Sequence, residues 1–178
     1  RVWVSEIMLQ QTRVEAVKNY YQRFMAALPD ISSLAQGEEQ QLLKLWEGLG
    51  YYSRVRNLQK AAQVIMREYN GVFPQHYEAI RQLPGIGDYT AGAIASICFE
   101  QPKAAVDGNV LRVMARITQD FAPIQLPLVK GQVGKKLAAV YPAGQCGAFT
   151  QALMELGATV CLPNGIPKCS QCPCAAFC

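Results

Sequence analysis

Apolar residues recur at helical spacing along most of the chain, and this periodicity limits the possible fold more than any other feature. Five runs place their apolar residues three or four positions apart, on one face of a helix. These runs are Val14, Val17, Tyr21, Phe24, Met25, Leu28; Val55, Leu58, Ala62, Ile65, Tyr69; Ala91, Ile94, Ala95, Cys98; Val110, Val113, Met114, Ile117; and Val129, Val133, Leu137, Val140. Glycine and proline break the pattern at short intervals, as at Pro29-Asp30 and Pro142-Ala143-Gly144. We therefore predict an all-α protein.

The size and composition of the chain fit one domain or two small ones. Its 178 residues are 51% hydrophobic, which is enough for a core. No stretch approaches the roughly 20 consecutive apolar residues of a membrane helix, and no basic-then-apolar stretch precedes a cleavage site in the given sequence, so we expect no membrane association. The chain begins at Arg1 without a methionine, and we expect it to be a fragment.

Basic residues gather after a Gly-Tyr-Tyr turn. Arg54, Arg56 and Lys60 follow Tyr51 and Tyr52 closely, on a chain with a net charge of +4. Positive charge beside aromatic surface suits the backbone and bases of a nucleic acid. A solvated helix face is the competing interpretation.

Four cysteines near the end of the chain predict a metal centre. Cys161, Cys169, Cys172 and Cys178 have the spacing C-x7-C-x2-C-x5-C, with Cys174 as an additional thiol. Disulfides fit less well because the total of seven cysteines is odd. Structural zinc usually takes two close ligand pairs, and only one is present here. A [4Fe–4S] cluster tolerates such spacing and is favoured, although the spacing alone leaves zinc open.

A glycine hairpin joins two predicted helices at Leu83-Pro84-Gly85-Ile86-Gly87. Gly85 and Gly87 allow a sharp turn that leaves amide N–H groups bare at the start of the next helix. Such amides bind phosphate without reading base identity. An ordinary loop between core helices is the alternative.

The hairpin followed by the cysteine tail resembles the helix-hairpin-helix DNA glycosylase superfamily. In its endonuclease III branch, a lysine just after the hairpin attacks the sugar and cuts the strand. Tyr89 occupies that place here. A tyrosine is not expected to form the Schiff base that cleavage needs, so the resemblance implies an enzyme that removes a base and largely stops.

Further motifs resemble adenine DNA glycosylases of the MutY type over essentially the entire chain. They are Ser5-Glu6-Ile7-Met8-Leu9-Gln10-Gln11-Thr12, Leu45-Trp46-Glu47-Gly48-Leu49-Gly50-Tyr51-Tyr52, Ala105-Val106-Asp107-Gly108-Asn109-Val110 and Glu155-Leu156-Gly157-Ala158. The resemblance departs from the family at the first cysteine interval, where x6 is commonest, and at Cys174. The given sequence stops at Cys178, so we expect it not to contain the family's C-terminal Nudix-like module, which helps to recognise 8-oxoguanine.

Two carboxylates suit the cleavage of an N-glycosidic bond. The reaction needs a proton for the leaving base and stabilisation of a cationic sugar. We expect Glu6, in the first turn of an apolar helix, to be the acid at N7 of adenine, its pKa raised by burial. Asp107 would stabilise the sugar or act as a transient nucleophile. A helix N-terminus could equally explain Glu6, and a helix cap near Asn109 could explain Asp107.

The same resemblance implies roles for other residues. Tyr89 lines the pocket, Asn109 supports Asp107 and Gln151 contacts the extruded adenine. Gln11 and Tyr51 match wedge residues that fill the gap left by a flipped base, although Tyr51 could be a core aromatic. Thr12 and Leu49 match positions that touch the opposite base.

Together these features predict a monomer that acts on double-stranded DNA containing an adenine mismatch. We expect a helical barrel lobe over residues 1–102, an iron–sulfur lobe over residues 103–178 and an active site in the cleft. The compartment would be the bacterial cytoplasm at the nucleoid, or the nucleus or mitochondrion of a eukaryote. Two alternatives remain: a glycosylase for mismatched thymine or oxidised pyrimidines, and a non-catalytic DNA-binding or redox module.

Overall fold

A computed structural model describes residues 1–178 and contains helices and loops without a strand. The all-α prediction is confirmed. The helices are α1 (Val2–Leu9), α2 (Val14–Ala27), α3 (Ile31–Gln36), α4 (Glu39–Trp46), α5 (Ser53–Glu68), α6 (Tyr77–Arg81), α7 (Asp88–Phe99), α8 (Gly108–Ile117), α9 (Pro127–Ala138), α10 (Cys146–Thr159) and the short 3-10 helices η1 (Cys169–Gln171) and η2 (Ala175–Phe177). None of the helices has the length and hydropathy that crossing a bilayer requires.

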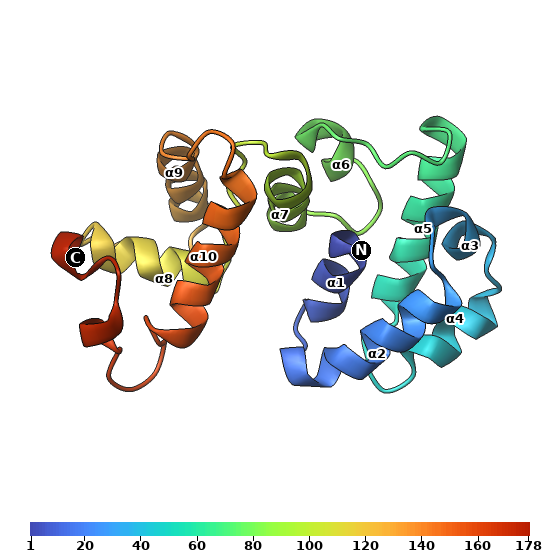
Figure 1. Cartoon of the computed structure of the whole chain (residues 1–178), viewed down its shortest axis with the longest axis horizontal. Coiled ribbons are helices and arrows are strands. Elements are labelled where there is room, and N and C mark those ends of the chain that lie inside the picture. The colour runs from blue at the N-terminus through green and yellow to red at the C-terminus, as the bar shows by residue number, and fades with distance from the viewer. The chain divides into compact units, whose positions relative to one another are not determined.

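The chain forms two compact units, residues 1–90 and 91–178, with the boundary inside α7. In the first unit, α5 packs against α1, α3 and α4, while α2 packs against α1 and α4 (Figure 1). Phe24 and Trp46 are fully buried and meet edge to face with ring centroids 5.8 Å apart. An aromatic pair of this kind contributes about 0.5–1.5 kcal/mol beyond the area that it buries.

Local sequence explains where these helices begin. Asp30 caps α3 by accepting from the Ser33 backbone N–H at 2.8 Å, and the Ser33 hydroxyl accepts from the Asp30 backbone N–H at 3.3 Å. Hydrogen bonds from Ser33 hold the pKa of Asp30 below its ordinary value. The predicted break at Pro29-Asp30 is therefore a capping box, which satisfies amides that a helix start leaves unpaired.

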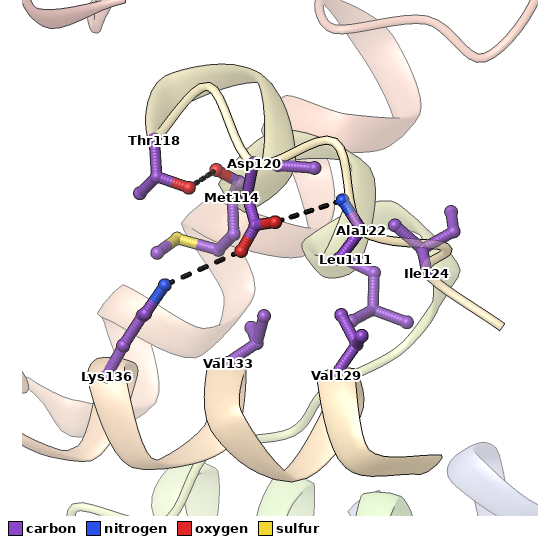
Figure 2. A pocket seen from close by; sticks show the side chains of 10 residues that line it. Leu111, Met114, Thr118, Asp120, Ala122, Ile124, Val129, Val133 and Lys136 are labelled. Carbon is purple, nitrogen blue, oxygen red and sulfur yellow. Dashed lines mark hydrogen bonds and ion pairs between the residues drawn. The ribbon is translucent and has the colours of Figure 1, made fainter. Parts of the chain in front are cut away.

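In the second unit, α8 packs against α9 and α10 (Figure 1). Its core is made by Val106, Val110, Leu111, Val129, Val133 and Leu137. Figure 2 shows a hollow beside this core, where Asp120 accepts from the Ala122 N–H at 3.0 Å and pairs with Lys136 at 3.6 Å. The hollow holds only about 10 Å³, the space of a single water, which is too small for a substrate.

Most of the periodic apolar residues are buried, but three of them are exposed. Val14 is 57% exposed at the first position of α2, and Val140 is 61% exposed beyond the end of α9. Cys98 is exposed near the end of α7. All three lie at or close to a helix end, where the apolar stripe no longer faces a neighbouring helix.

Candidate functional site

Glu6 lies in the middle of α1 and is half-buried. Its neighbours on the helix, Trp3, Val4, Ile7 and Met8, are buried. The prediction that Glu6 sits in the first turn is wrong, because α1 begins at Val2 and Ser5 bonds back to the Val2 carbonyl at 2.8 Å within the helix. A preference for helix N-termini therefore does not explain this carboxyl.

Two turns in the first unit carry the predicted wedge and opposite-base residues. Gln11 is exposed after α1, with φ at +57°, and Tyr51 is 60% exposed before α5, with φ at +47°. The interpretation of Tyr51 as a core aromatic is excluded. Thr12 is half-buried, whereas Leu49 is only 7% exposed. Leu49 therefore offers little of its side chain to a partner.

Arg54 is buried between these turns, so its assignment to a basic surface patch is wrong. It is 7% exposed, whereas Arg56 and Lys60 are exposed. Its Nη1 donates to the carbonyls of Ile7, Met8 and Gln10 and to Thr12 Oγ1, at 2.5 to 3.2 Å. Its Nη2 donates to the carbonyls of Leu49 and Gly50 at 3.1 and 3.2 Å. Burial lowers the pKa of Arg54, and the nearby Tyr51 acts in the opposite direction.

The glycine hairpin forms as predicted between α6 and α7. Gly85 is exposed and has φ at +77°, and a Cβ there would lie 2.7 Å from Asn57 Cβ on α5. Gly87 is exposed just before α7, and nothing lies within 4 Å of the place where its Cβ would be. Arg81 donates to the Asp88 carboxylate and thereby fastens α6 to the first turn of α7. The hairpin thus presents accessible backbone at a helix start.

Tyr89, the second residue of α7, is half-buried. The next residue, Thr90, is buried and accepts a hydrogen bond from Gln10 Nε2 at 3.4 Å. The start of α7 is therefore linked to the end of α1, where the Gln-Gln-Thr motif lies. Two sequence motifs eighty positions apart, by the separation of Gln10 and Thr90, meet here.

Asp107 is the N-cap of α8 in the second unit, which confirms the capping interpretation. Its Oδ1 accepts from the Val110 N–H at 2.8 Å, and its Oδ2 accepts from Asn109 Nδ2 at 3.1 Å. The predicted support of Asp107 by Asn109 is thus a direct hydrogen bond. Capping and chemistry do not exclude each other, because these contacts fix the carboxylate while the side chain remains half-buried rather than enclosed.

A chain of polar contacts runs from Asp107 to the cysteine tail. Arg112 Nη2 donates to Asn109 Oδ1 at 2.8 Å and to the Gly157 carbonyl at 2.6 Å. Arg112 Nε donates to the Cys161 carbonyl at 2.9 Å. A Cβ on Gly157 would lie 2.6 Å from Asn109 Cβ, so α8 and α10 touch at a point that only glycine fits. Gly157 belongs to the motif Glu155-Leu156-Gly157-Ala158, and this close contact explains why that motif has a glycine at this position.

Gln151 is exposed on α10. The first turn of this helix is fixed by Glu100, whose carboxylate accepts from the Cys146 N–H at 2.6 Å and the Gly147 N–H at 3.4 Å. A carboxylate there also complements the positive end of the helix dipole. Gln151 is therefore accessible on a helix whose start is firmly held.

The cysteine tail has no apolar core of its own. The 3-10 helices η1 and η2 contain no buried residue, and Cys169 and Cys178 are exposed. Arg116 Nη1 donates to Cys161 Sγ at 3.1 Å, and the Cys178 thiol lies 3.9 Å from the Arg116 carbonyl. Burial, followed by the neighbouring Cys172 thiol, raises the pKa of Cys174. No three His, Cys, Asp or Glu side chains are arranged here to hold a metal ion.

Three arginines hold these arrangements together. The sequence interpretation missed Arg112 and Arg116 and placed Arg54 on the surface. Arg112 lies three residues after Asn109, and Arg116 lies four residues after Arg112. Such spacing places Asn109, Arg112 and Arg116 on one face of α8, which is a signal that the sequence carries. The burial of Arg54 has no comparable signal, because four of its six acceptors lie 42 to 47 residues away in the sequence.

Comparison with known proteins gives a consistent result. The profile of the HhH-GPD superfamily of base excision DNA repair proteins matches residues 4–121. The adenine DNA glycosylases of Mus musculus and Homo sapiens are each 47% identical over 99% of this chain, which spans 34% and 32% of their lengths. That of Buchnera aphidicola (strain Bp) is 40% identical over 100% of the chain, which spans 50% of its length. The resemblance predicted from the motifs is confirmed.

Solved structures agree with the fold. A thermostable thymine-DNA glycosylase has a TM-score of 0.88 at 27% identity, covering 99% of this chain and 81% of that one. An endonuclease III in a non-covalent complex with DNA has a TM-score of 0.83 at 24% identity, with the same coverage. The helix-hairpin-helix fold predicted from the sequence is confirmed, and the chain belongs to the HhH-GPD superfamily of base excision DNA repair proteins.

Proposed function

We propose that this chain is the catalytic part of an adenine DNA glycosylase, which hydrolyses the N-glycosidic bond of adenine opposite 8-oxoguanine or guanine. The observation that carries the proposal is the fixed carboxylate of Asp107, whose two oxygens are each held by a donor. It lies in a chain 40 to 47% identical to adenine DNA glycosylases. A carboxylate held in this way supports a positively charged sugar without reorganising during the reaction.

The reaction divides between two carboxyl groups. Glu6 delivers a proton to N7 of adenine, which makes the base a better leaving group. Asp107 then stabilises the oxocarbenium-like sugar, or bonds to it transiently, until water adds. Asn109 holds Asp107 in place, Tyr89 orients the water or the intermediate, and Gln151 contacts the adenine. The half-buried position of Glu6 among apolar side chains supports its role as an acid.

An adenine stacked in a duplex is out of reach, so the proposal includes base flipping. Gln11 and Tyr51 fill the gap, which their exposure supports. Thr12 and Leu49 lie toward the opposite base, Leu49 through the little surface that it exposes. The amides following Gly85 and Gly87 bind a phosphate and set the register without reading sequence.

The cofactor in this proposal is a [4Fe–4S] cluster held by Cys161, Cys169, Cys172 and Cys178. Thiol donors are the ligands that such clusters take, and the tail has no buried residue that would order it otherwise. The Arg116 hydrogen bond to Cys161 Sγ is the kind of outer contact that suits a negatively charged ligand. When bound, the cluster supplies ligation energy that orders the tail.

A panel of duplexes tests the proposal. The protein, purified with its cluster, is incubated with A·8-oxoguanine, A·G, G·T and thymine glycol duplexes under single-turnover conditions, and the released bases are identified. Adenine released from the first two duplexes, with little strand cleavage, is expected. Preferential release of thymine or thymine glycol would overturn the choice of substrate.

The panel also separates the two alternatives. The structural similarity to a thymine-DNA glycosylase, with a TM-score of 0.88, supports a thymine-mismatch enzyme as the alternative. That protein is only 27% identical to this chain, whereas the mouse adenine DNA glycosylase is 47% identical, so we prefer adenine as the substrate. Release of no base from any duplex would favour a non-catalytic DNA-binding module.

A further inference from the structure

Arg54 is a buried cation whose hydrogen-bond partners are all uncharged. Its guanidinium donates to carbonyls and one hydroxyl, and its buried Nε has no partner. Removing a charge from water is costly unless the surroundings compensate it well. A hydrophobic side chain at this position would avoid that cost, so the arginine must do more than fill space in the core.

The acceptors of Arg54 come from two separate turns. One is the turn at the end of α1, where the Met8 carbonyl belongs to the last residues of the helix and the Gln10 carbonyl follows it; the other precedes α5 and contributes the carbonyls of Leu49 and Gly50. The planar guanidinium has donors on two nitrogens that point in different directions, so it can hold both turns at once. A lysine, with its donors on one atom, cannot reproduce this arrangement.

Each turn contains a residue other than glycine in the left-handed region. Gln11 has φ at +57° and Tyr51 at +47°. A residue other than glycine is strained at such a backbone angle, and this conformation persists only where the surrounding structure fixes the backbone. The hydrogen bonds from Arg54 end on the residues immediately before both, Gln10 and Gly50.

The side chain of Tyr51 is also held directly. The Arg54 Cζ lies 5.5 Å from the centroid of the Tyr51 ring and 5.4 Å from that of Trp46. Trp46 Nε1 donates to the Gly50 carbonyl at 3.1 Å, which secures the same turn. The ring of Tyr51 nevertheless remains 60% exposed.

We propose that Arg54 is a positioning residue that locks the two turns together, so that Gln11 and Tyr51 form a rigid wedge before DNA binds. This inference rests on the proposed function, because it assumes that these side chains enter a base stack. A preformed wedge loses little conformational entropy on binding, which favours unstacking of the mismatch. Arg54 itself touches neither substrate nor reacting atoms.

The test uses Arg54→Lys, with Arg67→Lys as a matched control. Arg67 is an exposed arginine near the other end of α5, paired with Glu68. A duplex carries 2-aminopurine beside an adenine mismatch, and its fluorescence rise on binding reports unstacking. We expect Arg54→Lys to abolish most of the rise and to weaken mismatch binding about tenfold. We expect Arg67→Lys to change neither. An unaltered fluorescence rise with folded Arg54→Lys would overturn the inference.

A mutant cycle distinguishes positioning from general destabilisation. In a Gln11→Ala, Tyr51→Ala background there is no wedge left to position, so Arg54→Lys should weaken mismatch binding no further. The same tenfold loss in that background would contradict the inference. Thermal unfolding of each variant, followed by circular dichroism, shows that binding is measured on folded protein.

A second variant serves if Arg54→Lys does not fold. Gly50 has φ at +69° with nothing within 4 Å of the place where a Cβ would be, so Gly50→Ala strains the turn beside Arg54 without a collision. Gly144 has φ at +71° and equally open surroundings in the second unit, which makes Gly144→Ala the matched control. Gly50→Ala should reduce the fluorescence rise and Gly144→Ala should not. Equal effects of the two would contradict the inference.

The fluorescence readout does not depend on which base is removed. If the wild-type protein binds mismatched DNA and unstacks the neighbouring base but releases no adenine, the proposed function fails while the wedge can still be tested. If adenine is released normally and Arg54→Lys leaves the fluorescence unchanged, only the inference about Arg54 fails.

Discussion

Asn109 donates a hydrogen bond from Nδ2 to Oδ2 of Asp107 at 3.1 Å, while its own Oδ1 accepts from Arg112 at 2.8 Å. The amide is therefore fixed in one orientation, with its donor facing the carboxylate. Asp107 in turn is fixed by both Asn109 and the start of α8. Asn109 therefore holds the predicted catalytic carboxylate of Asp107, and Arg112 holds Asn109.

Replacing Asn109 by leucine keeps the approximate shape and removes both hydrogen bonds. Loss of a hydrogen bond to a charged group costs about 1.5–3 kcal/mol, so the single-turnover rate of adenine release should fall about tenfold to a hundredfold. Thr118→Val, which removes a hydroxyl bonded to the Met114 carbonyl at the end of the same helix, is the control and should leave the rate unchanged. An Asn109→Leu protein with the wild-type rate would contradict the assigned role.

Gly157→Ala tests the close contact between α8 and α10. The added methyl group would lie 2.6 Å from Asn109 Cβ and must push the helices apart. Overpacking of this kind costs about 1–3 kcal/mol in the free energy of unfolding. It should also slow adenine release, because Asn109 is displaced.

The control for this change is Gly131→Ala on α9, where nothing lies within 4 Å of a Cβ. Alanine there should stabilise the protein by up to about 1 kcal/mol, since it favours the helix. Denaturant unfolding measures both variants. Equal stabilities for Gly157→Ala and the wild type would show that the contact is not tight.

Much of this arrangement could be predicted from the sequence, for identifiable reasons. The helices follow from apolar spacing, the break before α3 from Pro29-Asp30 and the hairpin from two glycines. Asp107 and Asn109 are two residues apart, so their contact is local and the motif contains it.

Long-range contacts are harder to predict. The sequence suggests a basic surface for Arg54, because nothing nearby shows that it donates to carbonyls 44 to 47 residues away, in the last part of α1 and the turn after it. Likewise, Gly157 is part of a motif, but glycine is needed there because α8 lies close to it, and no local pattern in the sequence reveals that contact. The first-turn position expected for Glu6 is wrong because α1 already begins at Val2.

The cysteine variants test the cluster and the spare thiol. Cys172→Ser should lower the bound iron and the visible absorbance of the purified protein, because serine replaces a thiolate ligand. Cys174→Ser should retain both, since four other thiols remain in the predicted ligand set. Iron and sulfide analysis measures the content of each protein. Loss of iron from Cys174→Ser together with retention in Cys172→Ser would reassign the ligand.

Tyr89→Lys tests why the enzyme is expected to leave the strand intact. A lysine at this position can attack the sugar and form a Schiff base, which tyrosine cannot. Borohydride should therefore trap a covalent protein–DNA complex with Tyr89→Lys and not with the wild type, as seen on a denaturing gel. Trapping of the wild-type protein would contradict a purely hydrolytic reaction.

The most direct test of the central claim is single-turnover release of adenine from an A·8-oxoguanine duplex by wild-type protein and Glu6→Gln. Glutamine keeps the size of the side chain but cannot supply the proton that the leaving base needs. We predict release by the wild type, and no detectable release by Glu6→Gln although it still binds the duplex. Adenine release by Glu6→Gln at the wild-type rate would contradict the account.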